Sequence, residues 1–428
     1  MRRRSLLVAL ALPAVALAAG CFTPDDRPAQ LAAIARWQDV RLAPADSLRT
    51  FLTGPDAHVR LAAVRAAGLI GRDDVLPEVM GATADPSLTV AAEAAWALGL
   101  MGDAEALPLL ATLAADPRPP LREAAVMGLT HLDNDGTALL RAAAHEDPVT
   151  AALAWNGLRN QAARVDTTAL REAIVAGLAR PETDIRWRVL RCAEMRADTT
   201  LVPVLAPFTR SPHDQVVVHA YRALARQDAA AALPAVLAGL AHLDDFHGRR
   251  AARVRIAACR ALGTVGRAAL DDTDDLRPDR VAATLISAAG HADPHVAETA
   301  LRAMTDLVAD RPLPAEAADQ ESLLPVWRIR LARAARGHLA SPHVGVRAAA
   351  VTALGATRGA GAAAELQRVL LMGETSPHVL AAALGAVAAH HPAPVPLLVA
   401  HLGDELPRTD PARGPRRLNG MVRAAALD

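Results

Sequence analysis

Five arginines recur at one position of a repeated segment and could together bind a charged group. Each lies five residues after a proline or after the residue that replaces it: Arg60, Arg122, Arg186, Arg255 and Arg347. Guanidinium groups at a constant spacing are suited to an anionic ligand. They are equally suited to pair with carboxylates or helix ends near the repeat boundary, such as Asp116 or Asp147. Because the residue recurs in phase and the total charge balances, we favour structural pairing between units.

Fifteen histidines raise the question of a metal site. The densest group of histidines and acids comprises His242, Asp244, Asp245 and His247. Imidazole and carboxylate suit zinc or another transition metal, but this spacing is no defined ligand pattern. An acidic insert, DDTDD from Asp271 to Asp275, lacks the glycine and glutamate of a calcium loop. We therefore expect a solvated loop for the histidine group and a solvated loop or a partner contact for the insert, and we predict no metal and no cofactor.

No catalytic motif accompanies these residues. The sequence contains no GxSxG, P-loop, GxGxxG or HExxH pattern, and nothing pairs a nucleophile with a base. We therefore predict that the chain is not an enzyme.

Four aromatic residues are candidates for binding hot spots: Trp96, Trp155, Trp187 and Tyr221. They lie 10, 7, 6 and 9 residues after their repeat prolines, so they do not all share one phase. An exposed member would serve as a partner contact. Packing between repeats is the favoured alternative.

The elements that carry these residues repeat along the chain. Pro55, Pro86, Pro117 and Pro148 follow one another at intervals of 31 residues. A second proline recurs 22 positions later in four units, and each unit reads as two helices. We expect the first proline at the first helical position, capped by the preceding aspartate. We expect a glycine such as Gly68 or Gly99 to end the helix in the left-handed region.

About ten such units lie between residues 30 and 402, and Cys192 and Cys259 are expected to be buried within them. The core D-P-x-x-x-V-R-x-x-A-x-x-A-L-G resembles the HEAT-like repeats of bacterial proteins, the short type also found in phycobilin lyases. The resemblance implies an all-α fold, a right-handed α-solenoid of about ten helix pairs.

This resemblance raises the possibility of two classes of enzyme. Deoxyhypusine hydroxylase, built on HEAT-like repeats, binds di-iron through four His-Glu dipeptides, whereas only His145-Glu146 occurs here. A HEAT-type metal or pigment enzyme is thus disfavoured.

The layout is also similar to arrays that precede a cyclophilin-type peptidyl-prolyl isomerase domain. Residues 422–427, VRAAAL, match the start of a repeat, so the chain is expected to stop inside a further unit. The alternative function is therefore the interaction arm of a longer isomerase.

The first residues read as a leader. Arginines at positions 2–4 precede an apolar stretch, Leu6 to Ala19, that is too short to span a bilayer. The small residues before Cys21 resemble the lipobox of bacterial lipoproteins, although Ala18 stands where leucine is usual. The resemblance implies that Cys21 is lipidated. Phe22 is no inner-membrane retention signal, so we favour the outer membrane, facing the periplasm.

Composition limits the partners. The chain has 46 basic residues, all arginine, against 46 acidic residues, and only ten aromatic residues. This balance argues against nucleic acid and against electrostatic binding to a membrane surface. We therefore predict an exported protein that contacts the membrane through its N-terminal lipid only and binds an unidentified protein.

The predicted organisation has six segments. They are a lipoprotein signal peptide (1–20), a tether (21–30), the HEAT-like array (31–265), the array with acidic and Pro-rich insertions (266–340), C-terminal HEAT-like repeats (341–402) and a Pro/Arg-rich end with an incomplete repeat (403–428). The predicted function is a lipid-anchored scaffold that binds protein through the groove and inserts of the solenoid.

Overall fold

The computed structural model describes residues 26–271, 276–309, 324–357, 361–371, 374 and 376–390. Every regular element in these ranges is helical, as the sequence predicts. The chain divides into two compact units, Met1–Ala173 and Ile174–Asp428, and the boundary falls inside α11 (Thr167–Ala179). Among the residues that the structure describes, no helix combines the length and apolar character needed to span a bilayer.

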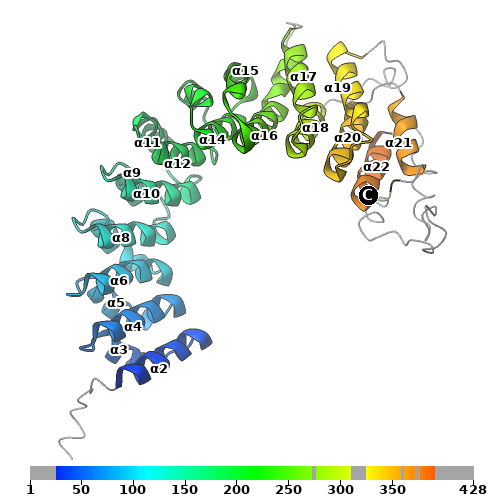
Figure 1. Ribbon diagram of the computed structural model, residues 1–428. Coiled ribbons are helices and arrows are strands. Elements are labelled where there is room, and N and C mark those ends of the chain that lie inside the picture. The colour runs from blue at the N-terminus through cyan, green and yellow to red at the C-terminus, as the bar shows by residue number, and fades with distance from the viewer. Residues whose placement is uncertain are drawn as a thin grey trace, which may run out of the picture. The chain divides into compact units, whose positions relative to one another are not determined.

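Each unit consists of two layers of helices, which we call row helices and second-layer helices. In the first unit the row helices are α2 (Arg27–Val40), α4 (Ala57–Ile70), α6 (Leu88–Met101), α8 (Pro119–Leu132) and α10 (Pro148–Gln161). The second-layer helices of that unit are α3 (Ala45–Leu52), α5 (Leu76–Ala82), α7 (Leu107–Leu113) and α9 (Thr137–Ala143). Successive row helices pack directly on one another, as Figure 1 shows for α4, α6 and α8.

The second unit repeats this arrangement. Its row helices are α12 (Thr183–Ala193), α14 (Asp214–Ala225), α16 (Gly248–Val265), α18 (Pro294–Val308), α20 (Val344–Thr357) and α22 (Pro377–His390). Its second-layer helices are α13 (Val202–Leu205) with the 3-10 helix Ala206–Arg210, α15 (Ala229–Gly239), α17 (Leu276–Ala289), α19 (Val326–Gly337) and α21 (Ala362–Leu371). Each row helix contacts the next one, and α17, α19 and α21 pack on α18, α20 and α22.

The described helices form ten consecutive pairs, from α2/α3 to α20/α21, followed by α22. The prediction of about ten helix pairs is therefore confirmed. The first helix of the described residues, α2, begins at Arg27, inside the segment 21–30 that we expected to be a tether. Helix α19 lies within the segment 266–340, which we expected to carry acidic and Pro-rich insertions.

The apolar residues of the row helices recur with helical spacing and form the core. In α6, for example, Val90, Ala94, Ala97 and Leu98 are all buried. Because alanine leaves little volume between helix axes, neighbouring row helices approach closely. A single pair has too little apolar surface to fold alone, so the stacking of neighbours creates the core.

The repeat prolines do not all occupy the first helical position. Pro148 and Pro294 do, and Asp147 and Asp293 cap their helices through hydrogen bonds to backbone N–H groups. At Pro86, however, the helix starts two residues later, and Asp85 accepts the N–H of Ser87 at 2.8 Å. The expectation was wrong there because the aspartate closes a local turn before the helix begins.

The prediction that Gly68 and Gly99 end their helices is also wrong. Both lie inside α4 and α6, and the chain leaves these helices at Gly71 (φ 73°) and Gly102 (φ 79°). The inner glycines instead permit contact between row helices. A Cβ atom placed on Gly99 would lie 2.3 Å from the Cα atom of Gly128 in α8. A side chain larger than hydrogen would therefore force the two backbones apart.

We predict that Gly99→Ala lowers the free energy of unfolding by about 1–3 kcal/mol, because the added methyl group meets backbone atoms that cannot move aside. Gly81→Ala in α5 is the matched control, since nothing lies within 4 Å of its Cβ position. That variant should be about 0.4–1 kcal/mol more stable than the wild type. Urea unfolding followed by circular dichroism measures both. Equal stability of the two variants would refute the close-contact role.

Candidate functional site

Arg60 lies at the boundary between two repeats and is fully engaged there. Its Nε and Nη2 atoms bond both carboxylate oxygens of Asp85, at 2.7 and 2.9 Å. Its Nη1 atom donates to the carbonyl oxygens of Gly54 and Pro55, each at 2.9 Å. The Arg60 side chain is 13% exposed and that of Asp85 only 6%. One guanidinium therefore joins the turn before α4 to the turn before α6.

Arg122 and Arg347 repeat this geometry, and we call Arg60, Arg122 and Arg347 the boundary arginines. Arg122 donates to Asp147 at 3.2 Å, to the Thr150 hydroxyl at 2.9 Å and to the Asp116 carbonyl at 2.9 Å. The Thr150 hydroxyl contributes more than Arg122 to lowering the pKa of Asp147, which falls to about 2. The carboxylate thus stays charged, and the pair stays intact, well below neutral pH.

Arg347 bonds both carboxylate oxygens of Glu374, at 2.9 and 3.2 Å, and donates to the Ser341 carbonyl at 2.9 Å. Here the carboxylate belongs to a glutamate three residues before the repeat proline, whereas Asp85 and Asp147 directly precede theirs. The same connection between two turns nevertheless forms. The boundary arginines therefore face carboxylates and carbonyls of their own chain, and their side chains are largely buried.

The other two arginines of the predicted set depart from this geometry. Arg186 lies over the ring of Phe208, 5.8 Å from its centroid, and its buried Nε has no hydrogen-bond partner among the described residues. Arg255 forms an ion pair with Asp244, which precedes it in the connection before α16. The five arginines therefore share one position in the sequence repeat but occupy three different environments in the structure.

The candidate metal residues do not converge. His242 contacts Asp245 at 3.3 Å, whereas Asp244 is engaged by Arg255. Across the described ranges, no three His, Cys, Asp or Glu side chains lie close enough to hold a metal ion. Residues 272–275 of the acidic insert lie outside those ranges, as does the predicted lipidation site Cys21.

The aromatic candidates separate into two groups. Trp155 and Tyr221 are completely buried and belong to the core, as packing between repeats requires. Trp187 is half-buried: its ring stacks on His219, with centroids 5.7 Å apart, and Arg188 covers it at 4.2 Å. Trp96 is half-buried on α6. Only the second group has surface left for a partner.

Cys192 and Cys259 are both buried, as expected, and no disulfide joins them. Burial raises the pKa of the Cys259 thiol to about 12, so it remains protonated at neutral pH. The two thiols act as small apolar core groups.

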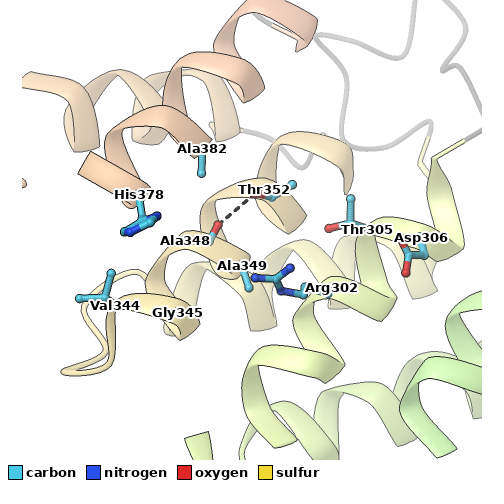
Figure 2. A pocket seen from close by; sticks show the side chains of 10 residues that line it. All are labelled: Arg302, Thr305, Asp306, Val344, Gly345, Ala348, Ala349, Thr352, His378 and Ala382. Carbon is cyan, nitrogen blue, oxygen red and sulfur yellow. Dashed lines mark hydrogen bonds between the residues drawn. The ribbon is translucent and has the colours of Figure 1, made fainter. Parts of the chain in front are cut away.

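A groove runs over the exposed side of the row helices α16, α18, α20 and α22, and we call it the α16–α22 groove. One hollow of ≈ 640 Å³ lies between α16 and α18, and another of ≈ 680 Å³ lies over α18, α20 and α22. Arg302 and Asp306 line both hollows, so the two join along α18. Figure 2 shows Arg302, Thr305 and Asp306 of α18 opposite His378 of α22.

The walls of the groove differ in chemistry. Arg302 extends from α18 and pairs with Glu298 one turn earlier, at 2.7 Å. On α20 the lining residues are small: Gly345, Ala348 and Thr352, whose hydroxyl donates back to the Ala348 carbonyl at 3.0 Å (Figure 2). The groove thus offers a charged wall and a low, small-residue floor, which suits an extended chain with polar side chains.

We predicted a groove but not the residues that line it, because we followed the arginine five residues after the proline. In three of the row helices the position that lines the groove is a different one, six residues after a buried valine. Val254 is followed by Arg260, Val296 by Arg302 and Val346 by Thr352. All three of the later residues line the groove. The signal was present in the sequence and needed only the helix start to be placed correctly.

We predict that Arg60→Met lowers the free energy of unfolding by about 3–5 kcal/mol, because Asp85 and two carbonyls lose their buried partner. Arg65→Met on the same helix is the matched control. Arg65 pairs with Glu93 at 2.7 Å, but its side chain is 52% exposed, so the cost should stay below about 1 kcal/mol. Urea unfolding measures both, and similar losses would contradict the assigned role of Arg60.

Comparison with known proteins agrees with this architecture. Residues 45–130 match the HEAT repeats family. The chain is similar to a chain from the structure in which Kap95p binding induces the switch loops of RanGDP to adopt the GTP-bound conformation. That likeness has a TM-score of 0.56 at 15% identity and covers 91% of this chain and 62% of the other.

A second similar structure is an engineered protein, with a TM-score of 0.47, 16% identity and coverage of 90% of this chain and 97% of the other. No curated protein sequence matches the chain. The helix pairs that continue beyond the matched segment make this chain an all-α solenoid, of which residues 45–130 match the HEAT repeats family.

Proposed function

We propose that the protein is a lipid-anchored, extracytoplasmic scaffold that binds another protein through the α16–α22 groove and has no catalysis of its own. The observation that carries the proposal is the groove itself. Two hollows of ≈ 640 and ≈ 680 Å³ meet along α18 on the exposed side of four consecutive row helices. Proteins built from stacked repeats typically bind their partners along such extended surfaces.

The side chains in the groove favour the recognition of a polypeptide. A guanidinium, carboxylates, threonine hydroxyls and imidazoles supply both donors and acceptors for peptide groups. The small residues of α20 leave room for the backbone of a partner to approach. A binding role uses each of these groups without requiring any of them to act as a nucleophile or base.

Photo-crosslinking tests the proposed function. The residue p-benzoylphenylalanine is placed at Ala348, on the groove floor, or at Arg333, an exposed residue of the second-layer helix α19. In cells that produce the full chain, Ala348 should give a discrete covalent adduct with another protein. The Arg333 position should not give that adduct. Identical adducts from both positions, or none from Ala348, would overturn the role of the groove.

The proposed location rests on the leader and Cys21. We predict that Cys21→Ser moves the protein from the membrane fraction to the soluble fraction, because the acyl acceptor is lost. Cys192→Ala, which changes a buried thiol in α12, should leave the protein in the membrane fraction. Fractionation followed by immunoblotting measures the distribution. Membrane retention of the Cys21→Ser variant would refute the lipid anchor.

A further inference from the structure

We propose that Arg191, Arg222, Arg260 and Arg302 form an arginine row that binds an acidic peptide with one carboxylate at every third residue. The inference rests on the proposed function, since it names the chemistry of the protein segment that the second unit recognises. The four arginines come from four successive row helices, α12, α14, α16 and α18.

The register of these arginines places them on one face. Each follows a buried aliphatic residue of its helix by six positions, namely Ile185, Val216, Val254 and Val296. Equal offsets from a buried residue give equal rotations about the helix axis. Since α12 packs on α14, α14 on α16 and α16 on α18, the four side chains follow one another across the stacked helices. Arg260 and Arg302 line the α16–α22 groove, so the row leads into it.

Most guanidinium groups of the row are not paired with a carboxylate among the described residues. Among the described residues, Arg191, Arg222 and Arg260 have no ion-pair partner, and Arg222 and Arg260 are exposed. Arg302 pairs with Glu298 on its own helix, yet its side chain remains 66% exposed. An exposed pair of this kind contributes little stability and exchanges readily for another carboxylate.

Several acids on or next to the helices of the row are engaged elsewhere. Asp184 pairs with Arg188, and Asp214 pairs with Arg253 at 3.2 Å. Glu194 is held by His219. Glu298, the partner of Arg302, and Asp306 line the hollow that also contains Arg260. The face therefore keeps three unpaired guanidinium groups in sequence.

The spacing of the row identifies the conformation of its ligand. Packed helices lie about 8–10 Å apart. A polyproline II segment rises about 3.1 Å per residue with three residues per turn, so every third side chain lies on one edge, about 9.3 Å from the next. In a β-strand, side chains on one face are only about 6.6–6.8 Å apart and would not meet the row. Each matched carboxylate can receive a bidentate guanidinium.

The same register carries other chemistry in the first unit. Val59, Val90 and Leu121 are followed six residues later by Arg65, Trp96 and Met127. Arg65 is engaged by Glu93, and the Met127 side chain is exposed and apolar. Consecutive arginines at this position are thus a property of the second unit, and an acidic ligand is assigned to that unit alone.

The test measures fluorescence anisotropy of labelled peptides with the full chain. One peptide has four Glu-Pro-Pro triplets, and a second has the same composition with its four glutamates adjacent. A third has Gln-Pro-Pro triplets, and a single-stranded oligonucleotide represents a general polyanion. We expect the Glu-Pro-Pro peptide to bind at least tenfold more tightly than each of the others, with affinity that falls as salt rises.

Variants locate the site. Arg222→Gln and Arg260→Gln should each weaken Glu-Pro-Pro binding about tenfold, because each removes one charge-assisted pair. Arg333→Gln, an equal loss of charge on α19, should leave binding unchanged. All three positions are exposed, and circular dichroism verifies that the variants fold.

Three results would overturn the row: equal binding of the clustered-glutamate peptide or the oligonucleotide, equal weakening by Arg333→Gln, or no binding of the Glu-Pro-Pro peptide. These results leave the proposed function standing if the Ala348 position still gives its protein adduct. The opposite result is also possible. If Ala348 gives no adduct but Glu-Pro-Pro binding still depends on Arg222, the proposed role of the groove is rejected and that of the arginine row is retained.

Discussion

The structure depends on the close approach of consecutive row helices. A glycine inside α6 lies against a glycine inside α8, and Gly263 of α16 lies near Ala303 of α18. Close contact at these positions determines how one repeat is placed on the next, and so where every other residue of the repeat lies. The buried alanines, the boundary arginines and the exposed face all follow from that placement.

This constraint explains why the boundary arginines recur. Once the axes of α4 and α6 are close, the turns before them lie near each other, and their carbonyls and carboxylates need a donor. A guanidinium reaches both turns at once, which an ammonium group with its single nitrogen does not. Arg60, Arg122 and Arg347 provide this donor, and the cost of desolvating the charge is offset by several hydrogen bonds to each guanidinium.

Much of the fold was predictable from the sequence. The proline period and the apolar spacing predict helix pairs, and the structure has them from α2/α3 to α20/α21. The positions of the helix ends were harder to predict from the sequence. Asp85 closes a turn before its helix begins, and Gly99 permits helix packing instead of ending the helix. These functions depend on a neighbouring repeat, which a local pattern does not contain. The residues that line the groove were missed for the same reason: they come together only when α18 and α20 lie side by side.

The boundary pairs also determine how the chain would respond to mechanical force. They connect residues only 25, 25 and 27 positions apart, at Arg60–Asp85, Arg122–Asp147 and Arg347–Glu374. Among the described residues each boundary pair joins only neighbouring repeats, so tension along this part of the chain acts on one repeat at a time. At about 3.3–3.6 Å per extended residue, each released repeat adds on the order of 100 Å of length. The solenoid is therefore an extensible element whose length under load grows in steps of one repeat.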